Sequence, residues 1–434
     1  MILRRLRRQL VMGLTALALA PGPALAAGAP RAQAITANAE SDPAHQVLVL
    51  LRLPPDHFHP GGNYVDSYGD GAGAAARRRV AQKIATAHGL TVVTSWPIPL
   101  AGVDCFVMMV PADQSPEQVA LVLARDPEVA SAEPMHVYRA QGSIQVAAVG
   151  TGRSSEDTGP THNDPLYRAQ PAAQEWRLAE LHEFATGKNV RVAVIDSMVD
   201  AAQPDLAGQI QTIQDFVLDH PRAAEQHGTG VAGIIAAVAD NHIGIAGVAP
   251  HARLMALRAC WQEGPSGAVC DTLSLAKALY FAIGHNAQII NLSLSGPPDP
   301  LLGRLIDMAM ARGTVVVGAL DPHAPGGGFP ASHAGVVPVT DDPGSAIPGA
   351  VVAPGREAPT TQPGGRFAFV SGSSYAAAHV SGLFALMREH GRAAPAPVAL
   401  VTAKPGGGGA IDSCASVLHA ACPRPGGTST LARE

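Results

Sequence analysis

Three residues of the kinds that together cleave acyl bonds lie far apart in this sequence. Asp196 ends an apolar run, His227 opens a run of small residues, and Ser374 follows Gly372 and Ser373. A serine hydroxyl is a weak nucleophile and needs an adjacent base. A histidine can supply that base, and a buried carboxylate fixes its tautomer and stabilises the imidazolium. The three residues are therefore candidates for nucleophile, general base and orienting acid.

Each of these residues also has an ordinary structural interpretation. Asp196 could be a strand-end carboxylate, His227 a loop histidine and Ser374 a helix N-cap, which is a common role for serine. The surroundings of Ser374 favour chemistry, because Gly372 allows a tight turn and the small residues after Ser374 predict a closely packed helix. Free N–H groups and the positive dipole end at a helix N-terminus favour a developing oxyanion.

Alternating strands and helices are predicted to position these residues. Residues 190–195 form a near-continuous apolar run, as expected for a strand buried on both faces of a parallel sheet. Ligands of such sheets bind at the carboxyl ends of the strands, where Asp196 would lie. The alternation indicates a parallel α/β sheet. Further strands are expected at 254–258, 289–294 and 314–319, and helices at 231–238, 273–284 and 301–312.

Three motifs resemble those of the subtilisin-like serine proteases, the subtilases. Residues 192–197 (Val-Ala-Val-Ile-Asp-Ser), 227–233 (His-Gly-Thr-Gly-Val-Ala-Gly) and 372–376 (Gly-Ser-Ser-Tyr-Ala) resemble the aspartate, histidine and serine motifs of that family. The chain order Asp, His, Ser is that of subtilisin. The resemblance extends over about residues 163–388. It implies a three-layer α/β domain with a mostly parallel sheet, and a serine endopeptidase acting through Asp196, His227, Ser374 and an acyl-enzyme.

The resemblance also implies a substrate cleft and exposes some departures from the family. Ser293, Leu294 and Ser295 resemble the strand that lines the family's cleft, although Ser295 replaces a usual glycine. Asp321, beside Pro322, is the best match to the asparagine that hydrogen-bonds the oxyanion in the family. An ionised carboxylate there would repel the oxyanion, so we expect Asp321→Asn to raise turnover.

Two other functions compete with the endopeptidase as interpretations of the sequence. The alternative is a catalytically weak or inactive subtilase-like protein that binds peptides and has an altered oxyanion hole at Asp321. A lipase or esterase is disfavoured, because the chain lacks a Gly-x-Ser-x-Gly elbow and has its candidate triad in the wrong order. The intact set of Asp196, His227 and Ser374 favours the enzyme.

The chain divides into several regions. Residues 27–141 predict a small α+β module, with strands at 46–53, 90–96, 103–111 and 129–138 and helices at 74–88 and 115–125. In size and position this module resembles the family's inhibitory propeptide, which implies a zymogen. A polar linker follows at 142–162, then a peptidase domain at 163–404 and a Gly- and Cys-containing tail at 405–434. We expect self-cleavage between about residues 140 and 162.

The first 26 residues have the layout of a secretory signal peptide. Four arginines, an apolar run at 10–20 and Ala24-Leu25-Ala26 occur in the order expected, with cleavage after Ala26. The apolar run is too short for a helix to span roughly 30 Å of hydrocarbon. Arg7 and Arg8 hint at twin-arginine export. We expect export to the periplasm or the extracellular space, with no membrane anchor after signal removal.

Five cysteines fit an exported protein. Cys260 and Cys270 bracket a short polar loop, and Cys414 and Cys422 lie close together, so two local disulfides are predicted in an oxidising compartment. Cys105 is left over in the region expected to be discarded. The alternative is that all five are buried free thiols.

Composition limits the partners. The 434 residues are 47% hydrophobic and 15% charged, enough for a sizeable core, and the formal net charge of −5 leaves no basic footprint for nucleic acid. We expect peptide or protein substrates, the chain's own propeptide as a partner, and a monomer. No cofactor is expected. Structural calcium is possible in the family, but no carboxylate cluster assigns a site.

Overall fold

The computed structural model describes residues 43–52, 71–145, 161–218, 220–264, 267–391, 399–404 and 408–419. The predicted signal peptide, residues 146–160 of the predicted linker and Cys422 lie outside these ranges. Within them, no helix is both long and apolar enough to cross a membrane.

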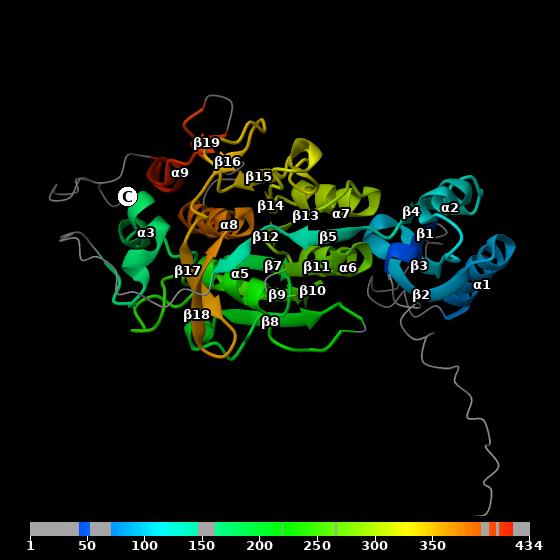
Figure 1. Cartoon of the computed structure of the whole chain (residues 1–434), viewed down its shortest axis with the longest axis horizontal. Coiled ribbons are helices and arrows are strands. Elements are labelled where there is room, and N and C mark those ends of the chain that lie inside the picture. Colours follow the sequence, from blue (N-terminus) through cyan, green and yellow to red (C-terminus); the bar gives the residue numbers. More distant parts are fainter. Residues whose placement is uncertain are drawn as a thin grey trace, which may run out of the picture. The chain divides into compact units, whose positions relative to one another are not determined.

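An eight-stranded sheet forms the centre of the peptidase region (Figure 1), and every neighbouring pair of its strands is parallel. The strand order is β19-β16-β15-β14-β12-β7-β9-β8. Because the strands are parallel, their carboxyl ends share one edge of the sheet, where polar residues can meet. The strands are β7 (Arg191–Asp196), β8 (Ile210–Asp215), β9 (Arg253–Arg258), β12 (Ile289–Leu292), β14 (Val315–Ala319), β15 (Val337–Thr340), β16 (Val351–Val352) and β19 (Gly409–Ala410).

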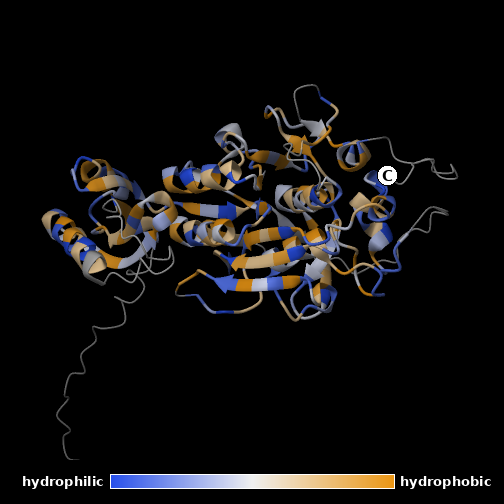
Figure 2. Cartoon of the chain, turned by 180° about the vertical axis from the view of Figure 1, so that it is seen from behind, coloured by the Kyte–Doolittle hydropathy of each residue, from blue (hydrophilic) through white to orange (hydrophobic). Residues whose placement is uncertain are grey.

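Helices cover both faces of this sheet, and strand β7 shows how. Its Val192 and Val194 join the core that contains α5 (Gln226–Ala236) and α8 (Ser373–His390). Its Ala193 and Ile195 join the core that contains α6 (Thr272–Gly284) and α7 (Pro300–Ala311). Successive side chains of a strand point to opposite faces, so β7 must be apolar throughout. Figure 2 shows hydrophobic residues along these central elements. The predicted three-layer α/β architecture is confirmed.

The N-terminal module has its own antiparallel sheet, in the order β2-β3-β1-β4, and its own apolar core. The Ser115 hydroxyl accepts a hydrogen bond from the Gln118 N–H and caps the second helix, as its sequence position predicts. The module is the expected small α+β unit. Its elements are β1 (Gln46–Arg52), α1 (Gly71–His88), β2 (Thr91–Ile98), β3 (Val103–Met109), α2 (Pro116–Leu123) and β4 (Val129–Pro134).

The prediction of a single strand at 129–138 is wrong, because this segment forms two strands that belong to two different sheets. After β4, the Met135 N–H still bonds to the Gln46 carbonyl, whereas the His136 N–H already donates to the Thr272 hydroxyl. The chain then continues as β5 (Val137–Ala140), which lies between β11 (Gly267–Asp271) and β13 (Leu294–Ser295). Strand β10 (Cys260–Glu263) completes that sheet.

Two segments that the sequence placed in a linker and a tail are folded onto the peptidase domain. Strand β6 (Ser143–Gln145) pairs with β18 (Arg366–Ser371), which in turn pairs with β17 (Ala358–Gln362). In the tail, β19 extends the large sheet, and α9 (Ser413–Leu418) follows it. The short helices α3 (Pro171–Glu175) and α4 (Leu178–His182) precede β7.

Candidate active site

Asp196 and His227 form a buried pair. Asp196 is the last residue of β7 and His227 the second residue of α5, and the His227 Nδ1 lies 2.8 Å from the Asp196 Oδ1. Their side chains are only 3% and 2% exposed. Because Nδ1 donates to the carboxylate, Nε2 is the nitrogen left with a lone pair, and this buried atom has no hydrogen-bond partner among the described residues. The pair can therefore accept a proton at Nε2.

Ser374 lies in the first turn of α8 and is fully buried. Its hydroxyl donates to the Ser293 carbonyl at 2.8 Å, and the Ser293 hydroxyl donates to the Ser374 carbonyl at the same distance. The next residue, Tyr375, has its ring centroid 5.5 Å from that of His227. The start of α8 thus lies beside the histidine, while the serine hydroxyl itself is turned toward Ser293.

A segment of the same chain occupies the cleft beside Ser374. Strand β5 pairs with β11 on one side and β13 on the other, and β6 pairs with β18. Between them, the Gln141 N–H donates to the Ser374 Oγ, and the Gln141 carbonyl accepts from the Ser374 N–H, each at 2.9 Å. The Gln141–Gly142 peptide bond therefore lies against the candidate nucleophile. Its carbonyl oxygen already uses a backbone donor at a helix N-terminus, where an oxyanion would be stabilised.

Two glycines permit this close approach. Gly372 has a φ of 139°, and a Cβ there would lie 2.5 Å from the Gln141 carbonyl oxygen and from the Gly142 Cα. A Cβ on Gly142 itself would lie 2.7 Å from the Cε2 atom of the buried Tyr375 ring. Any larger residue at either position would force the peptide away from Ser374.

The residues predicted to line the substrate cleft lie beside strand β5. Leu294 and Ser295 pair through their main chains with Ala140 and Arg139 of β5. Ser293 holds Ser374 in place, as described above.

Asp321 uses its carboxylate within its own loop. Its Oδ1 accepts from the His323 N–H at 2.8 Å, and its N–H donates to the Gly327 carbonyl at 2.9 Å. Its neighbour in the sequence, Leu320, accepts from the Ser373 hydroxyl through its carbonyl. The donor found on the Gln141 carbonyl is the Ser374 N–H.

The predicted disulfide between Cys260 and Cys270 is confirmed. The two residues face each other across β10 and β11, so the bond braces the hairpin whose second strand pairs with β5. Cys414 is disulfide-bonded, and Cys422 lies outside the described residues. Cys105 is a buried free thiol, and burial raises its pKa.

One group of residues near the start of the peptidase domain could approach a cation. Ligand atoms of His162, Asp164 and Asp240 lie within 4.8 Å of one another. Calcium prefers oxygen ligands, but the Asp164 carboxylate already accepts from the N–H groups of Asp240 and Asn241. Nearby Asp205 likewise accepts from the Asn241 side chain and the Ile245 N–H, and burial raises its pKa to about 6. These carboxylates are satisfied by N–H donors as arranged, and we assign no metal.

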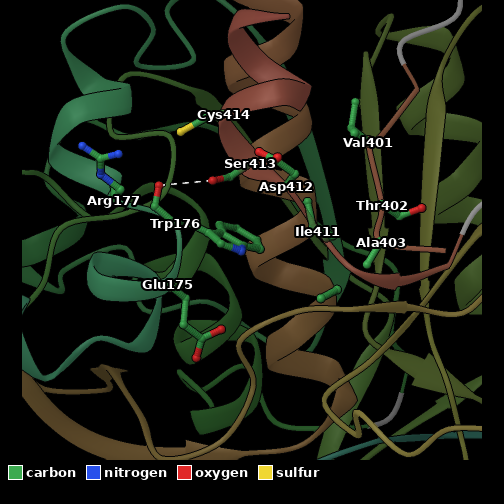
Figure 3. Close-up of a pocket in the computed structure, with 11 residues that line it drawn as sticks. Glu175, Trp176, Arg177, Val401, Thr402, Ala403, Ile411, Asp412, Ser413 and Cys414 are labelled. Atoms are coloured by element: carbon green, nitrogen blue, oxygen red, sulfur yellow. Dashed lines mark hydrogen bonds between the residues drawn. The ribbon is translucent and has the colours of Figure 1, made fainter. Parts of the chain in front are cut away.

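A separate surface pocket of about 590 Å³ contains none of the candidate catalytic residues. Figure 3 shows that it lies between the short helix region around Trp176 and residues 401–403 and 410–414, where the Ser413 hydroxyl donates to the Trp176 carbonyl. No sequence signal marked this pocket, because its two walls are more than 200 residues apart.

The chain is similar in sequence to known proteins. A sequence model described as the subtilase family matches residues 187–320 and 305–400. Thermitase from Thermoactinomyces vulgaris is 33% identical over 252 residues, which cover 54% of this chain and 88% of thermitase. The chain belongs to the subtilase family.

Other relatives of this subtilase are similar over varying lengths. The thermophilic serine proteinase of Bacillus sp. (strain AK1) is 33% identical over 293 residues, or 64% of this chain and 67% of that protein. Subtilisin E of Bacillus subtilis (strain 168) is 35% identical over 222 residues, or 46% and 56%. The crystal structure of fervidolysin from Fervidobacterium pennivorans has the same fold, with a TM-score of 0.62 at 22% identity, covering 87% of this chain and 61% of fervidolysin. Membership in this family makes the protein a serine protease at the family level.

Proposed function

We propose that this subtilase is an exported serine endopeptidase with Asp196, His227 and Ser374 as its catalytic triad. The observation that carries the proposal is the position of Gln141, whose N–H bonds to the Ser374 Oγ and whose carbonyl, part of the Gln141–Gly142 peptide, bonds to the Ser374 N–H. A peptide bond held against a helix N-terminal serine, beside a buried Asp–His pair, is the arrangement that acyl transfer requires.

The reaction follows from these positions. The Ser374 hydroxyl turns from Ser293 to the His227 Nε2, gives up its proton there, and attacks the carbonyl carbon of Gln141. The Ser374 N–H stabilises the oxyanion of the tetrahedral intermediate. Protonated His227 then gives its proton to the leaving nitrogen of Gly142, and the C–N bond breaks to leave an acyl-enzyme. Water, activated by His227, hydrolyses the ester, while Asp196 stays ionised and holds the imidazole.

We propose further that the N-terminal module is a propeptide and that the first substrate is the chain itself. The position of Gln141 narrows the expected self-cleavage site to the Gln141–Gly142 bond. After cleavage, β5 would still be paired on both sides, so the module would remain in the cleft as an inhibitor.

A fluorophosphonate probe tests the nucleophile. Purified full-length chain should cleave itself to give a fragment that begins at Gly142, as read by mass spectrometry, and should label at one serine once the cleaved module has left the cleft. Ser374→Ala should abolish both results. Ser373→Ala is the matched control, since that hydroxyl donates to the Leu320 carbonyl and has no catalytic role in the proposal.

The same experiment separates the enzyme from a peptide-binding protein without activity. A folded chain that neither labels nor cleaves itself would overturn the endopeptidase. Labelling with cleavage at another bond would retain the nucleophile but reject Gln141–Gly142 as the processing site.

A further inference from the structure

The cleft contains a closed side pocket that holds Tyr138, the fourth residue before the Gln141–Gly142 bond. Tyr138 is fully buried, and its ring centroid lies 6.2 Å from that of Phe329. Gly296 forms another wall, because a Cβ there would lie 2.5 Å from the tyrosine ring. The walls are thus shaped to an aromatic ring.

The far end of this pocket is polar. The Tyr138 hydroxyl lies 3.2 Å from the Pro297 carbonyl oxygen and 3.3 Å from the Asp299 Oδ2, and the Asp299 side chain is 0% exposed. A fully buried carboxylate at the end of an aromatic pocket is costly unless hydrogen-bond donors surround it.

The donors around Asp299 come from two sources. From the peptidase domain, the Leu302 N–H donates to Oδ1 and the Thr272 hydroxyl donates to Oδ2 at 2.8 Å. From the segment in the cleft, the Tyr138 hydroxyl and the His136 Nδ1, at 3.1 Å, face the same Oδ2. The peptidase domain therefore supplies one donor to each oxygen, and the bound peptide supplies the rest.

We propose that Asp299 determines substrate specificity: it selects peptides with tyrosine four residues, and histidine six residues, before the cleaved bond. The proposal rests on the proposed function, because the positions are counted from Gln141–Gly142. A phenylalanine would fill the pocket but leave the Asp299 Oδ2 with the Thr272 hydroxyl and the His136 ring, without the hydroxyl donor of the substrate. Sites built to bond a substrate hydroxyl reject the analogue that lacks it. A hydrogen bond to a charged group strengthens binding by about tenfold to a hundredfold. The kcat/KM for a tyrosine peptide should therefore exceed that for the phenylalanine peptide by the same factor.

Arg139, the third residue before the Gln141–Gly142 bond, should contribute little to substrate selectivity. Arg139 forms an ion pair with Glu263 at 3.0 Å, but the two side chains are 65% and 60% exposed. Exposed ion pairs are weak because water and salt screen them. Asp299 is buried and Glu263 is not, so selectivity should follow Asp299.

The test uses the self-matured enzyme and fluorogenic peptides that copy residues 135–143, with tyrosine, phenylalanine or alanine at the position of Tyr138. For wild type we expect kcat/KM to be about ten to a hundred times higher for tyrosine than for phenylalanine. Asp299→Ser keeps an N-cap for α7 but is too short to reach the pocket, so the ratio should fall to near one. Asp412→Ser is the matched control, because Asp412 caps α9 in the same way and bonds to Val401, Ala415 and Ser416.

A second substitution in the peptide checks the histidine. Replacing the residue that copies His136 with alanine should lower kcat/KM severalfold in wild type and leave it unchanged in Asp299→Ser.

A wild-type tyrosine-to-phenylalanine ratio near one would overturn the specificity proposal while leaving the endopeptidase intact. That ratio needs no variant, so it decides the matter even if Asp299→Ser does not fold. Failure to cleave every peptide, together with no fluorophosphonate labelling, would instead reject the proposed function.

Discussion

The two halves of the segment that crosses the cleft are held in different ways. The half before Gly142 is strand β5, which is paired on both sides and has Tyr138 buried in a pocket with a carboxylate at its end. The half after Gln141 is strand β6, which pairs with β18 on one side. At Gly142, the first residue of this half, the ring of Tyr375 leaves no room for a larger side chain. The first half is thus held by hydrogen bonding, whereas the second is limited by size.

The difference has a consequence for release. After the proposed cleavage, the second half would be held by one strand, whereas the first half would stay attached to the N-terminal module. Glu133 of that module lies near Asp299 and Arg304 of α7 and is 4% exposed. Burial, and then the charge of Asp299, raise the pKa of Glu133 from 4.5 to about 8. Arg304 and the Leu301 backbone lower this pKa, but their effects are smaller.

The largest expected effect is a pH dependence of propeptide release. Below about pH 4.5 Glu133 is protonated whether bound or free, so it carries no penalty. As the pH rises toward 8 the released module loses the proton while the bound one must keep it, so affinity should fall by about tenfold per pH unit and then level off. Size-exclusion chromatography of the self-cleaved complex from pH 5 to 8.5 measures this fall.

Variants of the N-terminal module show whether Glu133 causes the fall in affinity as the pH rises. Glu133→Gln mimics the protonated acid, and its complex should stay intact at pH 8. Glu128→Gln, on an exposed residue of the same module, should behave like wild type. Identical pH profiles for wild type and Glu133→Gln would show that another group controls release.

The next effect concerns the second half of the segment. Gly142→Ala should slow self-cleavage of the full chain by about a hundredfold, because displacing the reacting bond by even 1 Å has that cost. Tyr375→Ala removes the ring that the new methyl group would strike, so the double variant should recover much of the rate. Time courses on denaturing gels measure both.

Two observations would contradict this steric restriction. Gly142→Ala could mature at the wild-type rate, or Tyr375→Ala could fail to improve it although the single variant Tyr375→Ala matures normally. Ser143→Ala, at an exposed neighbouring position, is the control and should have little effect.

A smaller effect is expected from the disulfide, which braces the strand that pairs with the first half only. The double variant Cys260→Ser, Cys270→Ser should lose about 2–3 kcal/mol of unfolding free energy. Its kcat/KM should fall severalfold for peptides that extend four residues before the bond and less for shorter ones. Equal losses for long and short peptides would mean that the disulfide does not act through β11.

The smallest effect is expected at Asp321. Asp321→Asn should raise kcat, by much less than the hundredfold to thousandfold of a dedicated oxyanion donor, because the carboxylate is bonded to the His323 N–H. The measurement is kcat from pH 5 to 9 for wild type, Asp321→Asn and Asp321→Ala. A hundredfold gain in Asp321→Asn would show that this carboxylate reaches the oxyanion after all.

Local sequence patterns were enough for the main architecture and for the Asp–His pair. The apolar run at 190–195 predicts a strand covered on both faces, since each of its side chains needs an apolar neighbour whichever face it points to. The polar residue that ends this run, Asp196, then lies at the edge of the sheet where His227 meets it. The Ser115 cap and the Cys260–Cys270 bond were likewise foreseeable, because both depend on residues that are close in the chain.

Only the tertiary structure decided what fills the cleft. Residues 129–138 read as one strand, because a pattern of side chains does not say which partner each backbone group will choose. The partners of β5 lie more than a hundred residues away, in β11 and β13. Asp299, before Pro300, has the sequence of an ordinary helix cap, and it is one. Its second oxygen faces the pocket of Tyr138 because α7 begins where Thr272, His136 and Tyr138 converge, and that convergence exists in space and not along the chain.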